Sequence, residues 1–235
     1  QFLPYFCFKF YYYIMKKIIN LFVMSALLMS GCRSHVQNNH EYVDLGLPSG
    51  TLWATCNVGA TTPEGCGNYY AWGETQPKNT YNWSTYKYRN GDYLTKYCNE
   101  SDYGYIGFTD KLTVLQSGDD AATANWGNDW CMPTMKQWEE LSENTTNKWT
   151  TQNGVTGMLF TSKKNGVSLF LPAAGYRWDD EFDYVGSSGY YWSSSLYTSN
   201  PYGAWNFYFN SDNFDIDYCR DGGQSVRAVR SARQN

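Results

Sequence analysis

Alternating apolar and polar side chains predict a series of short strands separated by long loops. Residues 51–58 (TLWATCNV) alternate well enough for a strand and follow a Pro-Ser-Gly turn. Residues 167–172 (VSLFLP) form an apolar run that ends at a proline, and residues 224–230 (QSVRAVR) form a closing strand. Residues 59–110 are rich in Gly, Tyr, Thr and Asn without sustained periodicity, which predicts loops with short strands. The pattern therefore indicates a β-rich, loop-rich domain.

The strand predicted over residues 204–210 has two distinct faces. The apolar face, expected to point into the core, consists of Trp205, Phe207 and Phe209. The polar face, expected to meet solvent, consists of Asn206, Tyr208 and Asn210. Ligand binding and plain solvent exposure both explain such a polar face.

Two short helices are expected between the strands. Residues 119–124 (DDAATA) place two acids at the positive end of a short helix. A second helix follows Pro133, where residues 134–137 (TMKQ) match a capping box. Its apolar stripe consists of Met135, Trp138 and Leu141. The expected fold class is therefore α+β, with short antiparallel strands, two short helices and long loops. No internal repeat is present in the sequence, which argues against a solenoid or a propeller.

Composition narrows the class of protein. Aromatic residues make up 19% of the 235 residues, including 22 Tyr, whereas charged residues make up only 17%, against a usual ~25%. This excludes an intrinsically disordered chain, which lacks aromatic side chains, and a coiled coil, which needs Ala, Glu, Lys and Leu repeats. The formal net charge of −4 gives no electrostatic support for a nucleic-acid partner.

The N-terminal segment has the pattern of a targeting sequence. Met15, two lysines, an apolar run over residues 18–29 and Ser-Gly-Cys at 30–32 are typical of a secretory signal, and the run is short for a ~20-residue membrane span. Cys32 after these small residues resembles the lipoprotein box of bacteria, in which this cysteine becomes the diacylated N-terminus. An ordinary cleaved signal or a buried helix is the alternative.

These features give the expected organisation of the chain. Residues 1–14 are upstream read-through, 15–31 the signal peptide, 32–40 a polar tether and 41–235 a single domain. The protein is then expected in the cell envelope as an outer-membrane lipoprotein, attached to the membrane only through the lipid on Cys32. The sequence leaves open whether the domain faces the medium or the periplasm.

Few side chains in the domain can support catalysis. Both histidines, His35 and His40, lie in the tether, so residues 41–235 lack the histidine that Ser-His-Asp, Cys-His and HExxH sites require. Cys-x-x-Cys spacing and the calcium-loop motif DxDxDG are both absent from the sequence, so no metal or other cofactor is expected. We therefore expect a protein that is not an enzyme.

Carboxylates and cysteines are the remaining candidates. Acidic neighbours occur at Asp119/Asp120, Asp179/Asp180/Glu181 and Asp215/Asp217. Such neighbouring carboxylates are usually solvated or cap helices. Binding of a calcium ion is a better use of their oxygens than catalysis of glycoside hydrolysis. The seven cysteines less Cys7 and Cys32 leave five, an odd number, so at least one thiol is left over. Cys56 and Cys66 are close enough for a local disulfide, and two buried free thiols are the alternative.

Several ordered segments of the domain carry a resemblance to one family. They are residues 42–54 (YVDLGLPSGTLWA), 70–75 (YAWGET), 120–127 (DAATANWG), 132–134 (MPT), 171–177 (LPAAGYR), 189–195 (GYYWSSS) and 225–227 (SVR). Together they resemble the Fibrobacter succinogenes major paralogous domain proteins of gut Bacteroidetes, often lipoproteins. Cys131 departs from the pattern, which usually has Arg before Met-Pro-Thr. The resemblance implies a C-type-lectin-like fold, shared with formylglycine-generating enzymes and with the variable proteins of diversity-generating retroelements.

The resemblance also implies a place for ligand binding. In variable proteins of this fold, the stretch that matches residues 176–221 is the diversified ligand surface. Here that stretch holds eight Tyr, three Trp, four Phe and no Lys, a palette close to that of antibody loops. The ligand-binding residues expected by this resemblance are Tyr197, Asn200, Tyr202, Asn206, Tyr208, Asn210, Asn213, Asp215 and Tyr218. The ligand is expected to be a protein or a glycan.

Two other functions are compatible with the same fold. The first is a formylglycine-generating-type oxidase, for which the resemblance would imply a closely spaced pair of copper-binding cysteines near the C-terminus. Cys219 stands alone there, since the preceding cysteine is Cys131. The second is a passive surface or structural component without a ligand. A fold of this kind does not by itself decide among them.

Overall fold

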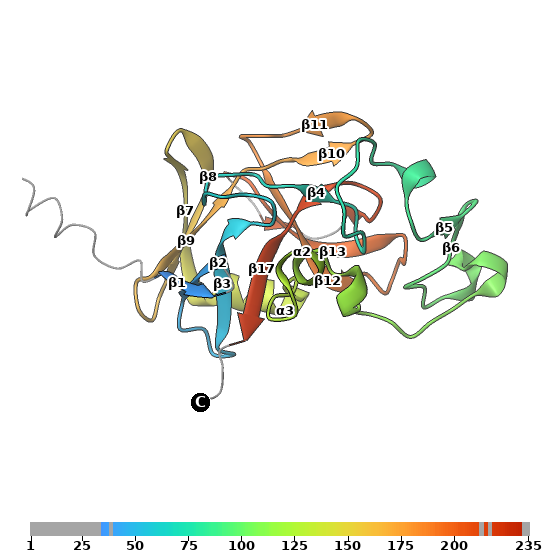
Figure 1. Ribbon diagram of the computed structural model, residues 1–235, viewed down its shortest axis with the longest axis horizontal. Coiled ribbons are helices and arrows are strands. Elements are labelled where there is room, and N and C mark those ends of the chain that lie inside the picture. The colour runs from blue at the N-terminus through green and yellow to red at the C-terminus, as the bar shows by residue number, and fades with distance from the viewer. Residues whose placement is uncertain (1–33, 38–39, 212–213, 216–217, 232–235) are drawn as a thin grey trace, which may run out of the picture. The chain divides into compact units, whose positions relative to one another are not determined.

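The computed structural model describes residues 34–37, 40–211, 214–215 and 218–231 (Figure 1). It is mostly β, with two short helices and several small antiparallel sheets, so the predicted α+β class is confirmed at this level. The predicted signal peptide and Cys32 lie outside the described residues. Within the described ranges, no helix combines the length and the apolar character needed to cross a bilayer.

A four-stranded antiparallel sheet joins early and late segments of the domain. Its strands, in order, are β1 (Ser34–Gln37), β2 (His40–Asp44), β3 (Thr51–Asn57) and β17 (Arg227–Ser231). Figure 1 shows β17 lying beside β3, with which it pairs. The segment expected to be a tether therefore contributes β1 and the first residue of β2. His40 stacks on Trp126, with ring centroids 3.9 Å apart.

A second sheet contains most of the C-terminal strands. Its order is β14 (Phe214–Asp215), β13 (Gly203–Phe209), β12 (Gly189–Leu196), β16 (Gln224–Ser225) and β4 (Tyr69–Tyr70), and β15 (Tyr218–Cys219) also pairs with β13. β12 and β16 pair in parallel, whereas the other neighbours pair antiparallel. This order places residues 224–225 beside the centre of the sheet.

Smaller units complete the fold. A three-stranded sheet consists of β7 (Thr145–Gln152), β8 (Val155–Ser162) and β9 (Ser168–Pro172). Two hairpins consist of β5 (Arg89–Asn90) with β6 (Tyr93–Leu94), and β10 (Tyr176–Trp178) with β11 (Glu181–Asp183). Short 3-10 turns lie at η1 (Trp83–Thr85), η2 (Ser101–Tyr103), η3 (Tyr105–Gly107) and η4 (Ser117–Asp119).

Both predicted helices are present. α2 spans Ala121–Trp126, two residues later than expected, because Asp120 is its N-cap and accepts a hydrogen bond from the Thr123 N–H at 2.9 Å. α3 spans Met135–Asn144 and begins with the predicted capping box of Thr134 and Gln137. The predicted stripe of α3 faces the core: Trp138 and Leu141 are buried and Met135 is half-buried.

Aromatic stacking fastens α3 to β13. The indole of Trp138 stacks on the ring of Phe207, with centroids 4.6 Å apart and planes 1° from parallel. Phe207 also lies 5.9 Å from Phe160 and 6.0 Å from Phe209, so rings from three elements meet at this point. Because large aromatic rings bury much apolar surface, these ring contacts contribute strongly to the stability of the core.

The prediction that β13 has one buried face and one solvent-exposed face is right in part. Phe207 and Phe209 are buried as expected, whereas Trp205 is only half-buried and packs edge-on against Tyr197 at 4.7 Å. Asn206, expected to meet solvent, is 1% exposed, and its Nδ2 donates to Gln224 Oε1 at 3.1 Å. The prediction for Asn206 is wrong because Gln224, in the buried segment 220–225, meets its side chain.

Two buried arginines join segments that lie far apart in the sequence. Arg227 donates from Nε to Asn57 Oδ1 at 2.8 Å and from Nη1 to the carbonyl oxygens of Ala54 and Thr55 on β3. Burial lowers the pKa of the Arg227 guanidinium. Arg220 donates to the carbonyl oxygens of residues 96, 97 and 201. Hydrogen bonds to carbonyl oxygens thus compensate in part for the burial of both side chains.

Candidate functional site

The hairpin of β10 and β11 begins directly after Gly175, a position that residues other than glycine cannot easily occupy. Gly175 has φ +61°, and a Cβ at this position would lie 2.0 Å from the Asp183 carbonyl oxygen and 2.7 Å from the Val185 nitrogen. The Gly175 N–H donates to the Ser188 carbonyl at 2.7 Å. The two legs of the hairpin therefore cross closely at its base.

A loop formed by residues 77–82 fixes the tip of this hairpin. Tyr81 and Asp179 exchange backbone hydrogen bonds of 2.7 and 2.8 Å, and Asn82 Nδ2 donates to Asp179 Oδ1 at 2.6 Å. The Arg177 guanidinium donates to the carbonyl oxygens of Lys78, Asn79 and, on its own hairpin, Asp180 at 2.9–3.1 Å. The hairpin and the loop are thus held together by at least five hydrogen bonds between them.

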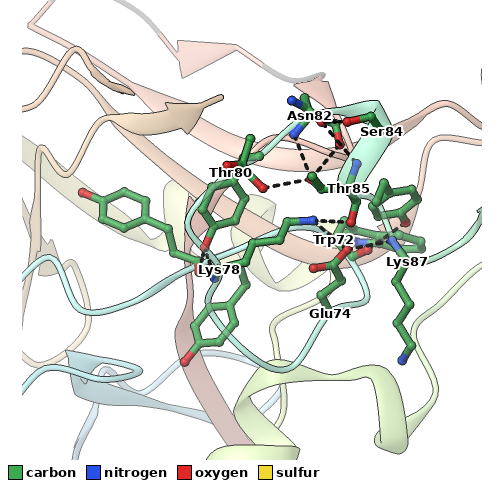
Figure 2. A network of polar contacts seen from close by, with 12 residues as sticks. Trp72, Glu74, Lys78, Thr80, Asn82, Ser84, Thr85 and Lys87 are labelled. Atoms are coloured by element: carbon green, nitrogen blue, oxygen red, sulfur yellow. Dashed lines mark hydrogen bonds and ion pairs between the residues drawn. The ribbon is translucent and has the colours of Figure 1, made fainter. Parts of the chain in front are cut away.

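Figure 2 shows how the loop itself is held. Glu74 Oε1 accepts hydrogen bonds from Lys78 Nζ and from the Lys87 N–H, both at 2.9 Å. Lys78 Nζ also donates to the Thr85 carbonyl oxygen at 3.1 Å, and the Thr85 hydroxyl donates to the Thr80 carbonyl oxygen at 2.8 Å. Glu74 is 9% exposed, so this ion pair is shielded from solvent. These hydrogen bonds connect the two ends of the segment 74–87 and so fix the conformation of the loop between them.

A cavity of about 610 Å³ lies between this loop and the hairpin, and we call it the hairpin pocket. It is lined by Cys66, Gly67, Asn68, Tyr69, Pro77, Lys78, Tyr81, Arg177, Phe182 and Val185. Phe182 and Val185 are 57% and 53% exposed, so one wall of the pocket presents apolar surface to solvent. Such a wall can pack against an apolar part of a ligand.

The polar groups of the hairpin pocket are largely committed to the protein. The Tyr69 hydroxyl donates to the Ala174 carbonyl oxygen at 2.5 Å, and the Tyr81 hydroxyl donates to the Tyr69 carbonyl oxygen at 2.6 Å. Burial raises the pKa of both phenols and also that of the Cys66 thiol, which therefore stays protonated at neutral pH. The Arg177 guanidinium lies 4.5 Å from the centre of the Phe182 ring. These groups shape the pocket and offer no activated nucleophile.

On its other side, the hairpin contacts a line of phenol rings that we call the tyrosine row: Tyr176, Tyr184, Tyr190 and Tyr208. Tyr176 lies 5.9 Å from Tyr184 and 5.0 Å from Tyr190, and Tyr190 lies 4.8 Å from Tyr208. Tyr184 is 58% exposed, and the other three are half-buried. Burial, followed by the neighbouring phenols and Asp183, raises the pKa of Tyr190. The Tyr190 hydroxyl therefore stays protonated at physiological pH.

Of the nine sequence-predicted ligand residues, Tyr208 lies in the tyrosine row and Asn210 lies beside it, where Asn210 Nδ2 donates to the Tyr208 hydroxyl at 2.5 Å. Tyr202 is half-buried against Trp83 and Tyr103, and Tyr197 packs on Trp205, so these two lie in other contacts. Asn200 is exposed, whereas Asn206 is buried. Asn213 and the side chains of Asp215 and Tyr218 lie outside the described residues.

Sequence reasoning missed most of the tyrosine row. Tyr190 was not among the expected ligand residues; it is half-buried, whereas its neighbours Tyr191 and Trp192 are fully buried. Tyr176 and Tyr184 were not singled out, nor was Phe182. The available signal was the density of large apolar side chains within the charged, turn-rich residues 176–185.

The other candidate groups have structural roles. Burial opposes ionisation of Asp119, but hydrogen bonds from Lys96 Nζ at 2.5 Å and from the Tyr88 and Tyr97 hydroxyls lower its pKa to about 2. Asp120 caps α2. Cys56 and Cys66 are free thiols, so the local disulfide is not formed. In the ranges that the structure describes, no three His, Cys, Asp or Glu side chains are grouped to hold a metal ion.

The hairpin thus presents two adjoining surfaces, the hairpin pocket and the tyrosine row, on a rigidly held support. Exposed rings on such a support can bind a ligand with little loss of conformational entropy. No protein-family model, curated protein or solved structure matches this chain.

Proposed function

We propose that this protein is a membrane-anchored lipoprotein whose C-type-lectin-like domain captures a ligand at the tyrosine row and the adjoining hairpin. The observation that carries the proposal is the continuity of the row. Four phenol rings, from the segment after β11 and from β10, β12 and β13, contact one another in a continuous line, each ring touching the next. A protein or a glycan is the ligand.

Tyrosine suits this role for a physical reason. Its ring supplies a large contact area with only two side-chain torsions to immobilise, and its hydroxyl supplies a hydrogen bond at the edge of that area. The Asn210 amide beside Tyr208 adds an adaptable polar contact. Exposed Phe182 and Val185 extend the surface toward the hairpin pocket.

The resemblance to variable proteins of diversity-generating retroelements also supports a C-terminal ligand surface. Under this proposal the surface is centred on the tyrosine row and overlaps the nine residues first expected at Tyr208 and Asn210. Asn206 belongs to the support, because its amide is buried against Gln224.

Replacing Tyr184 with alanine is expected to weaken ligand capture by about tenfold or more, the effect of losing an aromatic contact at the centre of a binding surface. Arrays of glycans and of host and bacterial surface proteins supply the ligand, and surface plasmon resonance measures its Kd. Tyr93→Ala is the matched control, because Tyr93 is 48% exposed on the β5–β6 hairpin, away from the row. Equal weakening by both variants, or by neither, argues against the proposed surface.

Membrane attachment has its own test. Because one acyl chain binds a bilayer only marginally whereas two or more anchor it stably, Cys32→Ala is expected to move the mature protein from the membrane fraction to the soluble fraction. Cell fractionation followed by immunoblotting measures the distribution. Full retention of Cys32→Ala in the membrane fraction would show that lipid on Cys32 is not the anchor.

A further inference from the structure

We propose that the tyrosine row and the acidic hairpin beside it bind a Lys- and Arg-rich segment of a partner protein. The inference rests on the proposed function and adds the chemistry of the ligand to it. Its basis is the combination, at one surface, of exposed aromatic rings and an excess of carboxylates.

The hairpin carries a net negative charge. Residues 176–185 contain Asp179, Asp180, Glu181 and Asp183 against the single cation Arg177, a net charge of −3. Asp180 and Glu181 are exposed, and Asp183 is half-buried next to Tyr190. Of these carboxylates, Asp183 borders the row directly, opposite Tyr176 in the strand pairing.

Among the described residues, no salt bridge reaches these carboxylates. Within the part of the chain that the structure describes, the salt bridges join lysines 78, 87 and 96 and Arg230 to Glu74, Asp119 and Asp129. None of them includes an acid of the hairpin. Lys78 is held by Glu74, and both terminal nitrogens of Arg177 donate to carbonyl oxygens. Asp180, Glu181 and Asp183 are thus available to an external cation, whereas the Asp179 carboxylate accepts a hydrogen bond from Asn82.

Phenol rings favour the same kind of ligand. The face of a tyrosine ring carries the negative end of its quadrupole and attracts an ammonium or guanidinium group. This fold uses that contact elsewhere, with Lys87 Nζ 4.7 Å from the centre of the Tyr88 ring and Arg230 5.4 Å from that of Trp130. Residues 176–221 contain no lysine. Ring faces and carboxylates together select a positively charged segment.

The arrangement is also held in place before any ligand arrives. The hairpin tip is fixed by the hydrogen bonds of Tyr81 and Asn82 to Asp179, and the loop behind it by the Glu74 network of Figure 2. A rigid surface binds at lower entropic cost than one that must be ordered. An acidic glycan is disfavoured here, because like charges at an interface repel.

The test uses fluorescein-labelled oligolysine, oligoglutamate and Gly-Ser peptides of equal length, titrated with the purified chain and followed by fluorescence anisotropy. Oligolysine is expected to bind most tightly and to lose affinity with added salt. The triple variant Asp180→Asn/Glu181→Gln/Asp183→Asn and the single variant Tyr184→Ala are each expected to weaken it about tenfold. The control triple variant, Asp92→Asn/Glu100→Gln/Asp102→Asn, changes exposed residues away from the row and should retain the affinity.

The outcomes separate the two proposals. If oligolysine binds no better than the Gly-Ser peptide, or if the control triple variant loses as much affinity as the hairpin variant, the cationic ligand is excluded. If a neutral ligand from the arrays then still depends on Tyr184, the proposed function stands without this inference. If nothing that binds the chain depends on Tyr184, both proposals are overturned.

Discussion

Replacing Phe207 with alanine is expected to lower the free energy of unfolding by about 3–5 kcal/mol, the usual cost of truncating a buried aromatic side chain. The Phe207 ring is 4% exposed and stacks on Trp138 at 4.6 Å, so its removal leaves a cavity between α3 and β13. The indole of Trp138 also packs against Trp53, with ring centroids 4.6 Å apart, which limits its movement into that cavity. Urea denaturation followed by far-ultraviolet circular dichroism measures the loss.

The neighbouring residue provides the control for this prediction. Tyr208 follows Phe207 on β13 but is half-buried, and its ring contacts Tyr190 at 4.8 Å. Tyr208→Ala is expected to cost only about 0.5–1.5 kcal/mol, the energy of one aromatic pair. Equal destabilisation by the two variants would mean that the two faces of β13 are assigned incorrectly.

Replacing Gly175 with alanine is expected to destabilise the domain by about 2–5 kcal/mol and to remove ligand binding at the tyrosine row. Two costs combine: an L side chain at positive φ costs about 1–2 kcal/mol, and overpacking costs about 1–3 kcal/mol. The new methyl group would lie 2.0 Å from the Asp183 carbonyl oxygen, so β11 must move away from β10. Thermal unfolding measures stability, and hydrogen exchange of residues 176–186 reports movement of the hairpin.

Gly186→Ala is the matched substitution. Gly186 also has positive φ, at +82°, but a Cβ there would meet nothing within 4 Å. It should therefore cost only the conformational term of about 1–2 kcal/mol and leave the hairpin protected from exchange. If Gly175→Ala proved no more costly than Gly186→Ala, the close crossing at the hairpin base would not be important for stability.

Local signals made part of the fold predictable from the sequence. The capping box of Thr134 and Gln137 and the stripe of Trp138 and Leu141 lie within one helix, so short-range periodicity was enough to find α3 and its buried face. Phe207 was assigned correctly to the core for the same reason, because alternation along one strand decides which side chains share a face.

The candidate site was less predictable because it depends on contacts between distant segments. Asn206 is buried by Gln224, which follows it by 18 residues, and no pattern within β13 indicates that cover. The hairpin is fixed by Asn82, which precedes Asp179 by 97 residues. Strand pairing brings Tyr190 and Tyr208 into register, and only that pairing joins Tyr208 to the rest of the row. Without the register, these tyrosines are merely part of an aromatic-rich chain.

The pairing of β17 with β3 has a consequence for the order in which the chain can fold. Arg227 donates to Asn57, 170 residues earlier in the sequence, so the first sheet cannot be completed until residues 227–231 have left the ribosome. The entropic cost of closing so long a loop comes before the favourable free energy of strand pairing. We therefore expect this sheet to form slowly after synthesis. Until then β3 has an unpaired edge that can join another chain, and a holding chaperone would protect the nascent protein from aggregation.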